Sequence, residues 1–147
     1  MEWVDVMLTY CQAPNHRPDH DAACPDVCDR LDNPQWDPYR SDCSGLVSWA
    51  WALPPPGRVT STFAPFDDTV SHAITAADLQ PGDAVNNDHH IMLFKEWVVP
   101  GEKATFIDEP GCSSSEPYAR EFTAEVTLDG ESLTVQYRGG YTAIREN

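Results

Sequence analysis

Two short turn signals in the second half of the chain constrain the fold more than any other feature of the sequence. Asp129-Gly130 lies between two segments in which apolar and polar residues alternate, and Pro100-Gly101 lies between two further apolar segments. Turns this short join neighbouring antiparallel strands, because parallel strands need a much longer connection. We therefore predict an antiparallel sheet, with strands over residues 84–85, 90–99, 103–107, 123–128 and 132–138.

The first half of the chain carries two helical patterns. Apolar residues have the spacing of one helical face within residues 2–10. A second, strongly apolar helix is predicted over residues 44–53, where Asp42 is a favourable N-cap and Pro54-Pro55-Pro56-Gly57 ends the helix. Helices followed by antiparallel strands predict an α+β fold.

Size and charge limit the classes of partner. The chain has 147 residues, which suits one domain with its own core over 1–147, and its 24 acidic and 9 basic residues give a net charge of −15. A surface this acidic repels phosphate groups, so nucleic acid and anionic membranes are excluded as expected partners. No apolar run approaches the roughly 20 residues that cross a bilayer, so no membrane insertion is expected.

The cysteines divide into two groups. The five are Cys11, Cys24, Cys28, Cys43 and Cys112. An odd number leaves at least one unpaired if the others form disulfides. Cys24, Cys28 and Cys112 lie in polar or loop-forming surroundings that suit disulfides, and thus a compartment outside the reducing cytoplasm. Cys43 is different, because it begins an apolar helical run.

The segment before Cys43 is unusual for its length. Residues 11–42 contain several prolines and many Asp and Asn residues, and they predict a long loop or an insertion. Within it, His16, His20, Cys24 and Cys28 recur every four residues, which is the spacing of metal ligands along one side of a helix. Prolines interrupt that helix, so disulfides or free thiols are the preferred interpretation and no metal or cofactor is expected.

Cys43 is the candidate nucleophile. A thiol becomes reactive when its pKa is lowered, and a helix N-terminus with a nearby imidazole does this. Cys43 follows the Asp42 cap, and the small residues Ser44 and Gly45 behind it would let a substrate backbone approach. The alternative is a buried structural cysteine, since free cysteines are among the most buried residues.

A histidine and a carboxylate complete the constellation. His89-His90 precedes an apolar strand, which places an imidazole at the edge of the sheet. A third polar group is needed to orient the imidazole. Asp108 ends the neighbouring predicted strand and is the first choice, while Glu109 would point to the opposite face. Histidines at such positions are also commonly structural or simply exposed.

These blocks resemble the NlpC-type cell-wall cysteine peptidases. The resemblance rests on Asp42-Cys43-Ser44-Gly45-Leu46-Val47, then Leu79-x-Pro81-Gly82-Asp83, then His90-Ile91-Met92-Leu93-Phe94, and then Asp108. It implies a compact papain-like fold, in which N-terminal helices that include the nucleophile helix pack on a small antiparallel sheet. It also implies Cys43 as nucleophile, His90 rather than His89 as general base and acid, and Asp108 as the orienting residue.

The same resemblance implies a substrate. The family cleaves amide bonds in peptidoglycan stem peptides and has a tyrosine near its oxyanion site, which Tyr10 matches, with Tyr39 as the alternative. Asp42 and Ser44 border the same site, and Trp36 is a candidate for a contact in the substrate groove because it lies in a loop. The expected function is therefore a cysteine hydrolase of bacterial peptidoglycan.

The setting of this activity is an expectation as well. The first residues lack the basic and apolar segments of a signal peptide, so delivery to the periplasm or cell wall by another route is expected. Such a domain suits a secreted antibacterial effector, for which a cognate immunity or inhibitor protein would cover the cleft. The alternatives are a Cys–His acyltransferase or deamidase acting on protein glutamine, and a binding or immunity module without turnover.

Overall fold

The computed structural model describes residues 1–12 and 33–147. The described chain forms two compact units. Unit 1 comprises Met1–Arg58 and Asp108–Arg120, and unit 2 comprises Val59–Ile107 and Glu121–Asn147. Each unit therefore contains segments that are distant in the sequence. Whether the chain is one catalytic domain over 1–147 stays a prediction.

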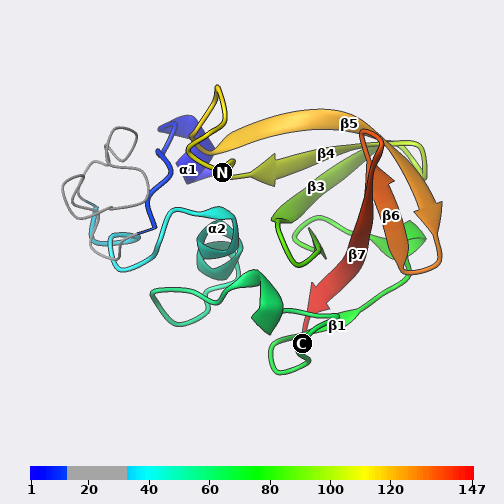
Figure 1. Ribbon diagram of the computed structural model, residues 1–147, viewed down its shortest axis with the longest axis horizontal. Coiled ribbons are helices and arrows are strands. Elements are labelled where there is room, and N and C mark those ends of the chain that lie inside the picture. The colour runs from blue at the N-terminus through cyan, green and yellow to red at the C-terminus, as the bar shows by residue number, and fades with distance from the viewer. Residues whose placement is uncertain (13–32) are drawn as a thin grey trace. The chain divides into compact units, whose positions relative to one another are not determined.

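Unit 2 is dominated by a closed, antiparallel β-barrel. The strands are β1 (Ser71–Ala73), β2 (Ala84–Asn86), β3 (Ile91–Val99), β4 (Lys103–Asp108), β5 (Arg120–Asp129), β6 (Ser132–Val135) and β7 (Arg138–Glu146). Their order is β1-β7-β2-β3-β4-β5-β6, and an additional pairing of β6 with β7 closes six of them into the barrel. Figure 1 shows β7 beside β6 at this closure.

The barrel closes because β7 pairs on both of its edges. It is antiparallel to β2 with Val85 opposite Ala143, and antiparallel to β6 with Leu133 opposite Tyr141. The short β1 also pairs with β7, from Ser71 opposite Glu146 onward. A strand of nine residues can serve several partners because different parts of its length face different neighbours.

Alternation along the strands fills the barrel with apolar side chains. In β5, Ala124 and Val126 are buried, while Glu125 between them and Thr127 after them are exposed. This is the period-two pattern of a sheet with one buried face. The buried cluster includes aliphatic and aromatic side chains from every barrel strand, among them Val85, Met92, Phe94, Phe106, Val126, Leu133 and Tyr141.

Unit 1 holds the two α-helices of the described residues, α1 (Glu2–Asp5) and α2 (Cys43–Ala50). Its core is aromatic: the Trp3 and Trp49 rings are stacked with centroids 5.1 Å apart, and Trp36 meets Trp49 edge-on at 5.9 Å. The helix expected over 2–10 ends at Asp5. Beyond it Met7 has a φ of 50°, and the chain then leaves the helix to pair with other segments of the unit.

The expectation of an α+β, papain-like fold is wrong. Strands make up 38% of the structure and helices 14%, and the strands close into a barrel instead of forming a small sheet covered by helices. The resemblance to NlpC-type peptidases is overturned with it. The physical reason is that α1 has four residues, too few to form a packing layer, while β7 joins both ends of the strand series.

Individual strands agree well with the sequence. The segments expected at 84–85, 90–99, 103–107 and 123–128 correspond to β2, β3, β4 and β5, and the Asp129-Gly130 turn joins β5 to β6 as an antiparallel hairpin. The strand expected over 132–138 is interrupted, because β6 ends at Val135 and β7 begins at Arg138. The sequence thus located β2 to β6, but it did not predict β1 or β7 and therefore missed the closure.

The long segment predicted over 11–42 is described only at its ends. These ends meet, because Cys11 and Ser41 form an antiparallel bridge with backbone hydrogen bonds of 3.3 Å and 2.9 Å. The residues of the alternative metal site, His16, His20, Cys24 and Cys28, lie outside the described residues.

Candidate functional site

Cys43 is the free cysteine of the described residues. Cys11 and Cys112 are both disulfide-bonded. The prediction that Cys43 stays outside the disulfides is therefore confirmed, and Cys112 is in one as expected. Cys43 is also the first residue of α2 and is half-buried, which leaves part of it open to solvent. A thiol at this position is available for chemistry.

Asp42 caps α2, as the sequence predicts. Its backbone is extended, and its Oδ1 accepts a hydrogen bond of 2.7 Å from the backbone N–H of Gly45. The Ser44 hydroxyl donates to the same oxygen at 3.3 Å. The other oxygen, Oδ2, forms an ion pair of 3.0 Å with Nε of Arg40. Both carboxylate oxygens of Asp42 are therefore engaged in holding the start of the helix.

The cap leaves two backbone donors of the first turn unused. An N-cap side chain satisfies one or two of the four N–H groups that a helix leaves open at its start. Asp42 takes the N–H of Gly45, and its carbonyl takes that of Leu46 at 3.0 Å. Among the described residues, the N–H groups of Cys43 and Ser44 have no acceptor. They are thus free to bind a developing negative charge beside the thiol.

Gly45 is required by the packing of this segment. A Cβ at Gly45 would lie 1.9 Å from the carbonyl oxygen of Arg40 and 2.8 Å from Oδ1 of Asp42. The backbone that approaches Gly45 is therefore that of Arg40 in the same chain, instead of the substrate backbone that the sequence suggested. The small residue at this position lets the chain before the helix fold back tightly against the first turn.

Arg40 connects the start of α2 to the segment that follows the helix. Besides Asp42, its guanidinium donates to the carbonyls of Gly57 and Arg58 at 3.0 Å and 2.9 Å. Its backbone N–H donates to the carbonyl of Pro56 at 3.1 Å. The sequence did not single out Arg40, because no local pattern indicates that it reaches residues 17 and 18 positions away.

We expect Asp42→Ala to lower the free energy of unfolding by about 1–2 kcal/mol, because it removes the N-cap acceptor and leaves Arg40 without its carboxylate. Chemical denaturation monitored by far-UV circular dichroism measures this change. Asp42→Asn is the matched control, since its amide oxygen can still cap Gly45 while the ion pair is lost, so it should cost less. Equal losses in both variants would contradict the capping role.

Asp108 has a partner that the sequence did not indicate. Its side chain is 2% exposed, and it accepts hydrogen bonds from Nε and Nη2 of Arg120 at 2.9 Å and 3.4 Å. The hydrogen bond to Asp108 raises the pKa of Arg120, so the guanidinium stays charged over the neutral range. Asp108 ends β4 and Arg120 begins β5, so this pair closes the segment between the two strands.

The alternative carboxylate, Glu109, is fully buried in unit 1. Its burial shows that it is not a surface residue, as a glutamate in a loop would ordinarily be. The side chains of Asp108 and Glu109 are therefore both shielded from solvent. The choice between them as the residue that orients the histidine stays a prediction.

The two histidines belong to unit 2, whereas Cys43 and Asp108 belong to unit 1. His90 is half-buried and His89 is exposed. Both backbone N–H groups donate to Oδ1 of Asn87, at 2.7 Å for His90 and 2.8 Å for His89, which fixes the turn before β3. Unit 1 contains no histidine among its described residues. The assignment of His90 as the base stays a prediction.

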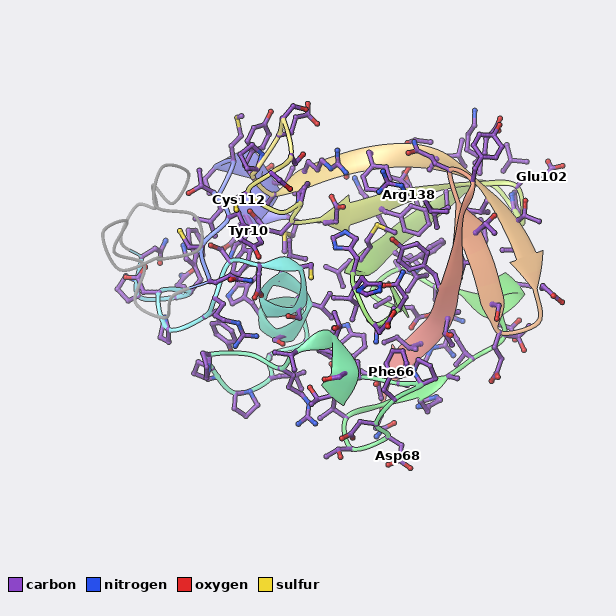
Figure 2. All side chains as sticks on the ribbon, viewed as in Figure 1. Tyr10, Phe66, Asp68, Glu102, Cys112 and Arg138 are labelled. Atoms are coloured by element: carbon purple, nitrogen blue, oxygen red, sulfur yellow. The ribbon has the colours of Figure 1, made fainter. Side chains whose placement is uncertain are left out.

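The remaining predicted site residues have different surroundings. Tyr10, labelled in Figure 2, is half-buried. Its backbone N–H donates to the carbonyl of Pro117 at 2.8 Å. Ser44 is buried beneath the cap. Trp36 is 6% exposed and packs against Trp49, so it lies in the aromatic core of unit 1 instead of projecting from a loop. The role of Tyr10 near an oxyanion stays a prediction.

Within residues 1–12 and 33–147, no group of three or more His, Cys, Asp or Glu side chains is arranged to hold a metal ion. None of the described helices has the length and apolar character needed to cross a membrane.

Comparison of this chain with protein-family models, with curated proteins and with solved structures found no match.

Proposed function

We propose that this protein is a thiol-dependent acyl-transfer enzyme that cleaves amide bonds through Cys43. The observation that carries the proposal is the free, half-buried Cys43 thiol at the start of α2, beside two backbone N–H groups that no described residue occupies. A thiol and oxyanion donors at one helix start are the two parts that acyl transfer through a cysteine requires.

In this mechanism a general base takes the proton of the Cys43 thiol, and the sulfur attacks the carbonyl carbon of the amide. The carbonyl oxygen gains negative charge, which the N–H groups of Cys43 and Ser44 are placed to stabilise. The amine leaves with a proton from a general acid, and a thioester to Cys43 remains. Water then attacks the thioester, the general base accepts its proton, and the carboxylic acid and the free thiol are released.

Asp42 is an unsuitable general base despite its position next to the thiol. One of its oxygens accepts from Gly45 and Ser44, and the other is paired with Arg40. Proton transfer through this carboxylate would require it to give up the cap. A histidine from elsewhere in the chain is the better choice, and the sequence predicts His90 for this role.

The substrate is proposed separately from the chemistry. Peptidoglycan stem peptides were expected through a family resemblance that the barrel fold overturns. They stay a proposal and are the first amide substrate to test. The disulfide-bonded Cys11 and Cys112 support action outside a reducing cytoplasm. A cognate inhibitor protein also stays a proposal, and so does a protein substrate that is deamidated at glutamine.

The proposal is tested by thiol labelling and by substrate digestion. The protein is treated with iodoacetamide under non-reducing conditions near neutral pH, and the modified cysteine is identified by peptide mapping. We expect Cys43 to react faster than N-acetylcysteine under the same conditions, because its sulfur lies at a helix start beside two open backbone N–H groups. Labelling of Cys43 that is no faster than this reference would contradict an activated nucleophile and favour the binding-module alternative.

Turnover is measured with purified peptidoglycan, by mass spectrometry of the released fragments, and with casein, by release of ammonia from glutamine. His90→Gln should abolish turnover on the substrate that is used, whereas His89→Gln, which changes an exposed neighbour, should leave it within about twofold. Equal activity in the two variants would show that His90 is not the general base. The role of Cys43 is tested separately, by the labelling experiment.

A further inference from the structure

Unit 2 carries a cavity of about 430 Å³ that contains none of the predicted catalytic residues. It lies where the outward side chains of β5 meet the β3–β4 turn and the β6–β7 turn. Glu125 and Thr127 point outward from β5 because Ala124 and Val126 point into the barrel. Thr134 of β6 is the cross-strand partner of Thr127, so the two hydroxyls share one face. The volume is in the range of about 300–1,000 Å³ that is typical of ligand sites.

The polar side chains around this cavity are available to a ligand. They are Glu102, Lys103, Glu125, Thr127 and Thr134. None of them forms a side-chain hydrogen bond or an ion pair with another described residue. Elsewhere in unit 2, by contrast, Asp83 is engaged by Arg145, and Lys95 by Glu121. Figure 2 shows Glu102 at the β3–β4 turn.

Tyr137 completes the cavity from the β6–β7 turn, where the two-residue hairpin geometry sets its backbone conformation. Gln136 and Tyr137 form the two-residue turn between β6 and β7, with φ values of 51° and 67°. Glycine and asparagine are the residues that adopt this left-handed conformation readily, and a tyrosine does so at a cost. The Tyr137 side chain is nevertheless 94% exposed, so its ring does not stabilise the barrel.

The observation that points to a ligand contact is an exposed aromatic ring beside a cavity whose polar side chains are unengaged. The ring supplies an apolar face, and the exposed Val99 on the end of β3 adds apolar surface. The glutamates accept hydrogen bonds, the lysine donates them, and the threonines do both. The ligand should therefore have an apolar face and several groups that both donate and accept.

We propose that this cavity binds a neutral saccharide of one or two rings. The C–H face of a sugar ring stacks on Tyr137, and its hydroxyls bond to the carboxylates, the ammonium and the threonine hydroxyls. Two glutamates and one lysine leave one net negative charge, which repels an anion. A simple cation would engage the glutamates but could not accept from Lys103 or from the threonine hydroxyls. A neutral polyhydroxyl compound can donate to the carboxylates and also accept from the ammonium and the hydroxyls, so it uses all of these groups. This proposal is independent of Cys43.

Binding is measured by ¹⁵N–¹H NMR titration of the full chain. The probes are N,N′-diacetylchitobiose, cellobiose and maltose, with tetramethylammonium chloride and sodium phosphate as the cationic and anionic comparisons. We expect at least one disaccharide to give saturable chemical-shift changes at Thr127, Thr134 and Tyr137, with a dissociation constant of about 1 mM. Absence of saturable shifts with all three disaccharides, or saturation by tetramethylammonium or phosphate alone, would overturn the proposal.

Three variants separate binding from folding. Tyr137→Gly relaxes the left-handed position, so the midpoint of thermal unfolding should be unchanged or higher, while affinity falls by at least about tenfold. Tyr137→Phe keeps the ring and should keep affinity. Gln136→Gly relaxes the neighbouring position and should also bind as the parent chain does. A Tyr137→Gly variant that binds the disaccharide normally would exclude stacking on this ring and overturn the proposed site.

Discussion

Replacing Cys43 with alanine should lower the rate of amide cleavage by about 10⁴-fold or more, because the variant cannot form the thioester on which the proposed reaction depends. The backbone N–H groups at the start of α2 remain in the variant, so binding of substrate is expected to persist while turnover is lost. Steady-state kinetics on the substrate that the parent chain cleaves measures this effect, as a loss in kcat with little change in KM.

The fold should survive this substitution. Cys43 is half-buried at the first position of α2, and alanine is the most favourable helix former. We expect the free energy of unfolding to change by less than about 1 kcal/mol. Cys43→Ser is the matched variant, since it replaces the thiol with a hydroxyl of similar size and should be almost as inactive. Full activity in either variant, with the fold intact, would refute Cys43 as nucleophile.

Gly45→Ala should lower the free energy of unfolding by about 3 kcal/mol or more, although alanine ordinarily stabilises a helix. The new Cβ would lie 1.9 Å from the Arg40 carbonyl oxygen and 2.8 Å from the Arg40 carbonyl carbon, closer than non-bonded atoms can approach. Backbone atoms cannot rotate away as the end of a long side chain can. The segment that carries the Asp42 cap must therefore move as a whole.

Gly111→Ala is the control for this prediction, because Gly111 belongs to the same unit and a Cβ there meets no atom within 4 Å. It should change stability by less than about 0.5 kcal/mol. Urea denaturation under the same conditions compares the parent chain, Gly45→Ala and Gly111→Ala. The Gly45 variant should also react more slowly with iodoacetamide at Cys43. Equal stability of Gly45→Ala and the parent chain would show that the approach of Arg40 is not needed for folding.

These two substitutions test different properties of one short segment. Cys43 supplies the reacting atom, and its replacement should affect chemistry without affecting stability. Gly45 supplies space, and its replacement should affect stability first and chemistry only through displacement of the helix start. If the Cys43 variants lost stability as well as activity, the thiol would have a structural role.

Local features of this protein were predictable from the sequence. The Asp42 cap, the helix that begins beside it and the Asp129-Gly130 hairpin all depend on residues within a few positions of one another. Cys43 was separable from the other cysteines because its surroundings are helical and apolar. In each case a short-range preference of the backbone or of a side chain decides the outcome.

Other features depended on contacts between distant segments. Arg40 reaches the carbonyls of Gly57 and Arg58, and Asp108 pairs with Arg120 across the segment that links β4 to β5. No local pattern indicates such contacts, because Arg and Asp residues in a polar stretch are ordinarily solvated. The expected helix over 2–10 failed for the same reason, since the chain after Asp5 pairs with residues that are 30 or more positions away.

By itself, the sequence determined where most strands lie and which thiol begins a helix, because period-two alternation, turn residues and helix caps act over short distances. The tertiary structure alone decided that the strands form a barrel and that the backbone of Arg40 packs directly against Gly45. Barrel closure requires β7 to pair with β2, more than 50 residues earlier, as well as with β6. Which strand edges meet is decided by packing of the whole chain, and that information is absent from the pattern of any single segment.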